Sequence, residues 1–388
     1  KEGQVPPWSD EVAERVRGTS FNWDREFQVW PRDFKPPSPP PYIFSDSGKP
    51  GPGGRVRLKY RPAGTSKRDE VQALEYEVTM YPGVVKLLTE INDHVLFATD
   101  EGYGQHVFYN LQTRQIMRVG GTLSPYSLGM FRGKLYVSGY PTSQLWEYDF
   151  ARKIGLQEAS NPRRVGWLGK ASMSHLPLDR IVGGADGRVY VGGTTVGRRR
   201  TGGGFAWYDT KTGKMGGDAF EGHRIFWICD AADGRYVLLS SKHGGDGQLY
   251  CWDTAEHKFI YQKPILGGGR PGPIVEALPG GLVIGHHGTG ELYGLKAATG
   301  EVLWRKKVPA RPLTSFSDIR RHRHSFRRGP DGHIWAFFDR TLVRIDPRDA
   351  RVRAVGQVPD QGQLAFAAGG VYIARGNRLR RIAGLRVQ

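Results

Sequence analysis

Short apolar runs separated by turn residues recur along most of the chain, and the stretch Gly272–Val308 holds one complete unit of this pattern. Within it, Pro-Gly-Gly, Gly-rich and Ala-Ala-Thr-Gly connections separate the runs Ile274–Leu278, Leu282–Ile284, Glu291–Leu295 and Glu301–Trp304. Runs of this length between turn residues are typical of β-strands. The pattern therefore predicts four antiparallel strands, here called A, B, C and D in chain order.

Similar units follow one another from Gly83 onward, and the last one, Gln363–Leu385, has only three strand-like runs. Four antiparallel strands in each repeat of about 40 to 50 residues is the pattern of a β-propeller blade. A closed ring must pair the free edge of the last unit, and the alternating run Val71–Met80 is the natural donor. We therefore predict an all-β, seven-bladed β-propeller over residues 55–388, closed by an N-terminal strand. An unassigned early strand from Arg55 leaves six or eight blades open.

Residues 1–54 are expected to form an arm rather than a domain. A helix-like piece begins at Ser9, a plausible N-cap, and the Pro-rich run Lys35–Phe44 follows. Proline cannot donate to a β-ladder, so this run is expected to be extended, unpaired and wrapped on the propeller. Aromatic anchors would be Trp23, Phe27, Trp30 and Phe34. A disordered linker is the alternative.

A formal net charge of +18 favours anionic partners, but it says nothing about fold. No apolar run is long enough for a transmembrane helix. The start at Lys1 without Met suggests a removed leader, which favours a secreted or periplasmic protein. Cys229 and Cys251 fall on strands A and C of one unit, too far apart for a disulfide, so we expect two buried free thiols.

The segments ADGRVYVGG, FAWYDTKTG and GELYGLKAATGEVLW resemble the PQQ-like and WD40-like repeat superfamily, over roughly residues 83–385. The resemblance implies the propeller fold. It does not imply a quinoprotein dehydrogenase, because those enzymes usually have eight blades and many have an adjacent Cys-Cys pair that this chain lacks. The chain is also similar in architecture and residue types to propeller-type polysaccharide lyases, including the ulvan and rhamnose-glucuronate lyases.

Histidines are unevenly distributed over the predicted topology. The D-to-A and B-to-C connections of a propeller emerge at one end of its channel, which we call the mouth face. Four histidines are predicted in B-to-C loops, namely His106, His243, His286 and His287. Four more are predicted near the starts of A strands, namely His175, His223, His322 and His324. Solvated loop histidines without a shared role are the alternative.

These residues suit β-elimination on a uronate polysaccharide, which needs a base, an acid and cations that neutralise the substrate carboxylate. Topology alone nominates the catalytic residues His223, His175, His324 and Tyr126. It nominates as substrate-binding residues Arg224, Arg327, Arg321, Trp227, His243, His287 and Tyr140. No cofactor is required, and the partner would be an anionic polysaccharide bound by a monomer. A binding or scaffold propeller for an anionic polymer or a protein is the alternative.

Other site chemistries have weaker support. Three histidines from different blades can hold a divalent ion in the channel, but no metal motif of fixed spacing occurs. For a glycoside hydrolase the mouth face offers only Asp230, Asp246 and Asp318. The remaining aspartates are predicted to be structural, in A-to-B turns (Asp186, Asp233, Asp331) or at the ends of C strands (Asp149, Asp209, Asp253, Asp346). Nucleic acid is less favoured, because the basic residues are scattered.

Overall fold

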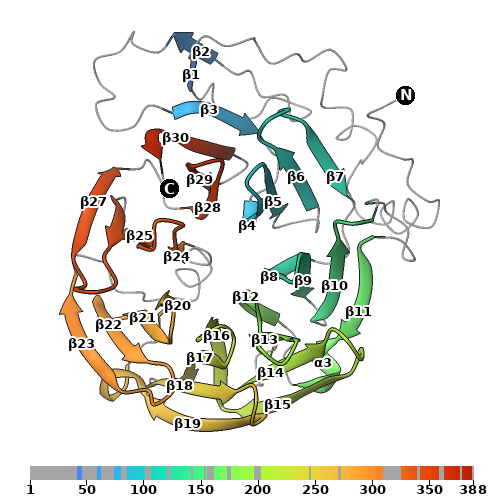
Figure 1. Ribbon diagram of the computed structural model, residues 1–388, viewed down its shortest axis with the longest axis vertical. Helices are drawn as coiled ribbons and strands as arrows, with labels where there is room; N and C mark the ends of the chain where they lie inside the picture. The colour runs from blue at the N-terminus through green and yellow to red at the C-terminus, as the bar shows by residue number, and fades with distance from the viewer. Residues whose placement is uncertain are drawn as a thin grey trace.

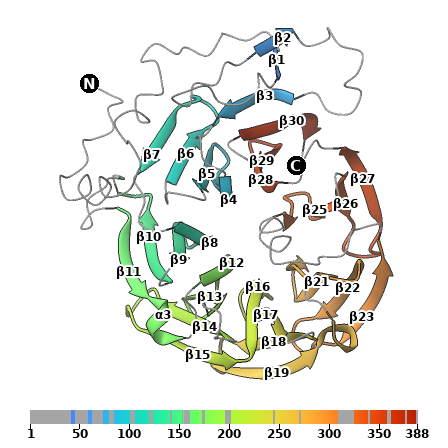
Figure 2. The same ribbon diagram turned by 180° about the vertical axis from the view of Figure 1, so that it is seen from behind.

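A computed structural model describes the strands Tyr42–Ser45, Lys59–Pro62 and Leu74–Thr79 and then residues 85–100, 106–119, 124–140, 143–152, 154, 161–172, 176–195, 202–243, 246–269, 272–308, 325–338, 341–357, 362–375 and 378–386. Nearly all of these residues lie in strands, and the sheets surround a common centre (Figure 1). The view from behind shows the same ring (Figure 2). The predicted all-β class is confirmed.

Each run of four strands presents one strand to the centre. The inner strands are β4 (Val85–Asn92), β8 (Ser124–Phe131), β12 (Leu176–Gly183), β16 (His223–Ala231), β20 (Ile274–Leu278), β24 (Phe326–Arg328) and β28 (Gln363–Ala367). The second strands are β5 (Val95–Asp100), β9 (Lys134–Tyr140), β13 (Arg188–Thr194), β17 (Tyr236–His243), β21 (Leu282–His287), β25 (Ile334–Phe338) and β29 (Gly370–Arg375).

The third and fourth strands complete the sheets toward the outside. The third strands are β6 (His106–Asn110), β10 (Gln144–Asp149), β14 (Gly202–Asp209), β18 (Asp246–Asp253), β22 (Glu291–Lys296), β26 (Thr341–Ile345) and β30 (Arg378–Arg386). The outer strands are β7 (Ile116–Val119), β11 (Arg163–Trp167), β15 (Met215–Glu221), β19 (Lys258–Pro264), β23 (Val302–Lys307), β27 (Val352–Gln357) and β3 (Leu74–Thr79). The described residues also form two short helices, α3 (Leu168–Ala171) and η1 (Ile265–Gly267). In the described part of the chain, no helix has the length and apolarity needed to cross a membrane.

Five of the described sheets have four strands, and a larger sheet joins β8–β11 to β12–β15 through one parallel bridge between Leu128 and Arg180. Gly129 permits this close approach, because a Cβ atom there would lie 1.8 Å from the carbonyl oxygen of Ile181. Any side chain at this position would therefore force β8 and β12 apart.

The edge of the last three-stranded run is covered by an N-terminal strand. β3 pairs antiparallel with β30, with Val78 opposite Leu379. This pairing places strands from both ends of the chain in one sheet, so the edge of β30 is not left open.

One expectation for the N-terminal arm is wrong. The sequence Tyr42–Ser45, which ends the Pro-rich run, forms β1 and pairs antiparallel with β2 (Lys59–Pro62). The prolines end at Pro41, so the residues after it keep the amide donors that a ladder needs. The expected helix at Ser9 and the expected aromatic anchors lie outside the described residues.

Hydrophobic cores lie between neighbouring sheets. All five residues of β25 are buried, because a middle strand packs against other sheets on both faces. In one such core, Tyr190 and Phe205 from β13 and β14 pack with Ile228 and Tyr250 from β16 and β18. Burial of each large apolar side chain contributes about 1.5 to 3 kcal/mol. The sequence runs predicted as strands are therefore the same residues that hold the ring together.

Aspartates after the third strands cap the next turn, as predicted. Asp209 Oδ1 accepts hydrogen bonds from the backbone amides of Lys211 and Thr212 at 3.0 and 2.9 Å. Asp253 Oδ1 does the same for the two amides that follow it in the equivalent turn. This is Asx-turn chemistry, which fixes the chain reversal without any catalytic role.

Both cysteines are buried and free, which confirms the sequence prediction. Cys229 on β16 and Cys251 on β18 both lie opposite Leu238 of the intervening strand β17. Two inter-strand spacings separate them by about 9 to 10 Å, beyond the reach of a disulfide.

Candidate functional site

Most of the connections predicted for the mouth face lie outside the described residues, and so do His175, Arg321, His322 and His324. His243 is the last residue of β17, and nothing is described of its side chain. The expected convergence of His175, His223 and His324 on one cavity therefore stays a prediction.

His223 begins the inner strand β16 and is half-buried. Its Nδ1 atom lies 2.9 Å from the hydroxyl oxygen of Tyr250, and the two rings meet edge to face at 5.8 Å. Tyr250 belongs to β18, two strands outward, so the imidazole leans along its own sheet rather than toward the centre. Burial raises the pKa of Tyr250 to about 12, which keeps the phenol protonated. Arg224, the next residue, is exposed.

Two predicted tyrosines are placed at different depths. Tyr126 on β8 is partly buried and packs against the core cluster that contains Trp227. Tyr140 is the last residue of β9, and 40% of its side chain surface is exposed. Tyr126 therefore belongs to the edge of the core that holds Trp227, while Tyr140 remains open to solvent.

Trp227 and His287, both predicted to bind substrate, are core residues with 1% and 3% exposure. The two ring nitrogens of His287 contact Thr289 Oγ1 at 2.7 Å and the Gly268 carbonyl oxygen at 3.2 Å. Burial lowers the pKa of His287, so it is neutral and tied to the turn after β19. Neither ring presents a surface that a polymer in solution reaches.

The expectation that B-to-C histidines lie in loops is wrong. His286 and His287 continue β21 and pair with Leu292 and Glu291, because a tight turn lets the ladder run to its end. They point to opposite faces, as expected for an extended pair: the His286 ring contacts Phe338 and His287 contacts the turn at Gly268. His106 and His243 also lie within strands.

Arg327 joins three inner strands. From β24 it pairs with both carboxylate oxygens of Glu90 on β4, at 2.6 and 2.9 Å, and donates to the Leu364 carbonyl oxygen on β28 at 2.7 Å. Only 15% of its side chain is exposed. Its guanidinium is thus used inside the ring, where it satisfies an acidic side chain of another sheet.

Arg180 plays a similar part that sequence reasoning missed. From β12 its Nη2 atom donates to the carbonyl oxygen of Phe326 on β24 at 2.8 Å, although two other sheets separate these strands along the ring. An arginine beside Asp179 in a mostly apolar inner strand was the available signal, because a cation with little exposure needs acceptors. Arg180 and Arg327 together link inner strands across the centre.

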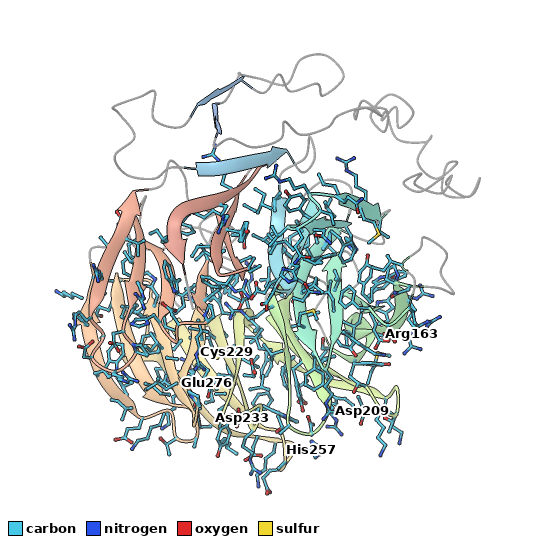
Figure 3. All side chains as sticks on the ribbon, turned by 45° about the horizontal axis from the view of Figure 1, so that its top comes forward. Arg163, Asp209, Cys229, Asp233, His257 and Glu276 are labelled. Carbon is cyan, nitrogen blue, oxygen red and sulfur yellow. The ribbon has the colours of Figure 1, made fainter. Side chains whose placement is uncertain are left out.

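Two inner-strand carboxyl groups have raised pKa values. The Asp230 side chain on β16 is solvent-accessible, yet the protein around it removes enough hydration to raise its pKa. Loss of hydration also raises the pKa of Glu276 on β20, and the charge of Asp230 adds to the effect. Glu276 Oε1 accepts from the amides of Ala232 and Gly281 at 2.7 and 3.1 Å, which ties together the turns of two sheets. Figure 3 labels Glu276, Cys229 and Asp233 in this part of the ring, where the charge of Glu276 also acts on Cys229.

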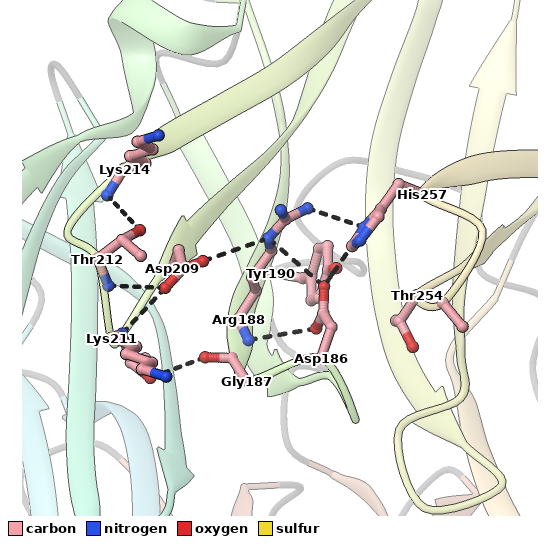
Figure 4. Close-up of polar contacts among 12 residues, drawn as sticks. Asp186, Gly187, Arg188, Tyr190, Asp209, Lys211, Thr212, Lys214, Thr254 and His257 are labelled. Atoms are coloured by element: carbon pink, nitrogen blue, oxygen red, sulfur yellow. Dashed lines mark hydrogen bonds and ion pairs between the residues drawn. The ribbon is translucent and has the colours of Figure 1, made fainter.

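At the opposite end of the ring, where the A-to-B and C-to-D turns lie, a polar network joins side chains of several turns (Figure 4). We call this end the turn face. Asp186 Oδ2 accepts from the Tyr190 hydroxyl at 2.6 Å, and Arg188 Nη1 contacts His257 Nδ1 at 2.9 Å. Arg188 Nε also lies 3.8 Å from Asp209 Oδ2. These contacts join the β12–β15 and β16–β19 sheets. The charged side chains of the network therefore already have partners within the protein.

Within the described ranges, no group of three or more His, Cys, Asp or Glu side chains is placed to hold a metal ion.

Comparison with known proteins supports the fold. A family model described as outer membrane protein assembly factor BamB matches residues 221–379, which is less than half of the chain. The WD40 β-propeller domain of Doa1 is similar with a TM-score of 0.56 and 12% identity, covering 81% of this chain and 97% of that domain. The Cps50 (Swd1) β-propeller domain of Myceliophteria thermophila has the same TM-score and identity, with 80% and 98% covered. No curated protein matches the chain. At these identities the structural matches establish that the chain has a β-propeller fold.

Proposed function

We propose that this protein is a seven-bladed β-propeller that acts as a binding scaffold for an anionic partner. Seven blades follow if the eight-stranded sheet is counted as two, since only one bridge joins its halves. A match to a family named for an assembly factor favours the scaffold class over the enzyme class.

The observation that carries the proposal is the division of charge between the inside and the outside of the ring. The inner cations Arg180 and Arg327 are already bound to acceptors of the protein. In contrast, the basic side chains of the outer strands face solvent, as at Lys306, Lys307 and Arg353. With a formal net charge of +18, this arrangement leaves the positive charge of the outer strands available to outside partners.

Binding to polymers of different charge tests this function. We expect the protein to bind polygalacturonate and polyglutamate, but not neutral dextran, because the attraction is electrostatic. The apparent affinity is expected to fall steeply as salt rises from about 50 to 500 mM, over which range screening shortens from roughly 14 to 4 Å. Equal binding of dextran, or affinity that salt does not change, would refute the proposal.

A second candidate is lyase activity on a uronate polysaccharide, favoured by the His223–Tyr250 pair beside the exposed Arg224. In this reaction a base removes the C5 proton, a cation balances the C6 carboxylate, and an acid protonates the leaving oxygen. His223 would be the base or its neighbour, Arg224 the cation and Tyr126 the acid. A secreted or periplasmic monomer would meet such substrates.

Ultraviolet absorbance separates the two candidates, because elimination creates an unsaturated uronate and binding does not. For a lyase, His223→Ala is expected to lower turnover by about 10² to 10⁴ with polymer binding mostly kept. Arg224→Ala should instead weaken polymer binding. Absence of the unsaturated product with every uronate polymer tried would leave the scaffold function alone.

A further inference from the structure

The outer strand β23 has two exposed large apolar side chains, more than any other outer strand described. Leu303 is the most exposed large apolar side chain in the described ranges, at 45%, and Val302 beside it is 41% exposed. Trp304, the next residue, is only partly buried, and its ring packs over Gly294 of β22. Adjacent exposed aliphatic residues on an edge strand indicate an interaction surface, because covering them removes apolar surface from water.

The backbone of β23 is open on its outer side. Among the residues that the structure describes, β23 pairs with β22 only. The amide of Val308 donates to the Gly290 carbonyl oxygen at 3.0 Å, which fixes the alternation of the ladder. Because successive amides of a strand point to opposite sides, those of Lys306 and Trp304 face β22 and those of Lys307 and Arg305 face outward. Two donors are thus presented to a strand lying alongside.

The side chains of β23 determine which charge a strand docked beside it should carry. Arg305 is balanced by Glu291, with Nη2 and Oε2 3.0 Å apart. Lys306 and Lys307 are exposed, and neither lies within ion-pair distance of a carboxylate among the described residues, although the charge of Lys306 contributes to the lowered pKa of Asp349. Two cations beside the open amides favour carboxylates at the positions opposite them.

We propose that the edge of β23 over Trp304–Lys307 is a docking site for an extended acidic segment of a partner polypeptide. The segment adds as an antiparallel strand, with acidic residues opposite Arg305–Lys307 and apolar residues over Val302 and Leu303. Main-chain hydrogen bonds supply the affinity, and the side chains supply the choice of partner. The proposal rests on the scaffold function above and names its site and the class of its partner.

A second copy of this chain does not fit the same edge. Antiparallel pairing of two copies of β23 over residues 305–307 places Lys306 opposite Lys306 and Arg305 opposite Lys307, and like charges on facing strands are destabilising. The register shift at Leu303 further limits regular pairing to the residues after it. The features that prevent self-association therefore leave the edge open to an acidic strand.

The test uses a fluorescein-labelled peptide with the sequence Gly-Glu-Glu-Glu-Thr-Val-Val-Gly and fluorescence anisotropy with the full chain. A second peptide has the same sequence with N-methyl groups on alternate residues, which removes the edge hydrogen bonds but keeps charge and side chains. We expect N-methylation to weaken binding about tenfold or more. Hydrogen exchange should show the amides of Arg305 and Lys307 protected by the unmethylated peptide. Equal binding of the two peptides would overturn the proposal.

Charge-reversed variants locate the site. Lys306→Glu with Lys307→Glu is expected to weaken peptide binding about tenfold or more, whereas Lys211→Glu with Lys214→Glu, in the exposed turn before β15, should change it less than about threefold. Equal effects of the two variants, or no peptide binding at about 1 mM, would overturn the proposal. If the peptide fails while polygalacturonate and polyglutamate bind, only the docking site is wrong. Failure of every anionic ligand refutes the scaffold function as well.

Discussion

Two histidine–tyrosine pairs occupy different environments in this ring. His106, at the start of β6, has no exposed surface, and its Nδ1 contacts the hydroxyl of Tyr148 on β10 of the neighbouring sheet. His223, at the start of β16, makes the same contact with Tyr250 of its own sheet but is only half-buried. The chemical groups are the same, and the difference between the pairs is access to water.

Burial changes what a histidine can do. Nε2 of His106 has no hydrogen-bond partner in the described ranges, and aromatic rings such as Phe97, 5.3 Å away between centroids, surround it. Desolvation lowers the pKa of His106 to about 3, so the ring stays neutral and joins two sheets. His223 keeps part of its ring in water. Solvent access therefore makes His223, and not His106, the histidine available for ligand binding or proton transfer.

The largest effect is expected from opening the sheet next to His106. A chain that begins at Pro82 lacks β3 and leaves β30 as an open edge. That sheet packs on the one that holds His106, with Tyr372 and Leu379 in the same core as Val107. We expect a loss of about 4 kcal/mol or more in the free energy of unfolding, measured with urea.

A chain that begins at Ser66 keeps β3 and serves as the control. Hydrogen exchange should show lost protection in β4–β6 while β16–β18, around His223, stays protected. If the chain that begins at Pro82 were as stable as the full chain, β3 would not be needed to close the ring.

His106→Ala is expected to have the next largest effect. It opens a cavity among aromatic rings and leaves the Tyr148 hydroxyl without this partner, at a cost of about 2 to 4 kcal/mol. His223→Ala is expected to cost less than about 1 kcal/mol, because water replaces the half-buried ring. Urea unfolding of both variants measures the contrast. Similar losses would mean that the two histidines are equally structural.

The positions of the strands could be predicted because strands that are buried on both faces have continuous apolar runs in their sequence. The predicted run Ile274–Leu278 coincides with β20, and the predicted start at Glu291 coincides with that of β22. Structural roles of Asp209 and Asp253 were predictable too, since Asx turns depend on contacts between neighbours in sequence.

Roles that depend on contacts between distant residues could not be predicted. No local pattern indicates that Arg327 pairs with Glu90, 237 positions away, or that Trp227 faces a core rather than the mouth. The placement of His286 and His287 in a strand also depends on a turn that lets the ladder continue. Sequence therefore indicated which residue types were available for a site, but not which of them other parts of the ring already use.

Acid is expected to destabilise the folded protein through His106, which is buried as a neutral ring. Its pKa falls from the ordinary 6.5 to about 3, so between these values the unfolded chain binds a proton that the folded chain does not. Stability is therefore kept above pH 6.5 and declines as pH falls toward 3, by about 1.4 kcal/mol per unit, or roughly 2 kcal/mol at about pH 5. His287, whose pKa is also lowered, adds in the same direction. Urea unfolding of wild type and His106→Gln from about pH 7 to 4.5 isolates the contribution of His106, because the difference between them should shrink with acid. A constant difference would show that His106 is not buried as a neutral ring.

The smallest effect is expected from removing the Tyr250 hydroxyl. Tyr250→Phe should cost about 0.5 to 1 kcal/mol, because half-buried His223 can exchange the lost contact for water. Tyr148→Phe should cost about 1 to 3 kcal/mol, since both nitrogens of His106 would then be buried without a partner. A double-mutant cycle of Tyr250→Phe with His223→Ala measures the pair alone, and a coupling below about 1 kcal/mol is expected. The same cycle of Tyr148→Phe with His106→Ala gives the coupling energy of the buried pair. A larger coupling energy for His223 with Tyr250 than for His106 with Tyr148 would show that the half-buried pair, and not the buried one, is structural.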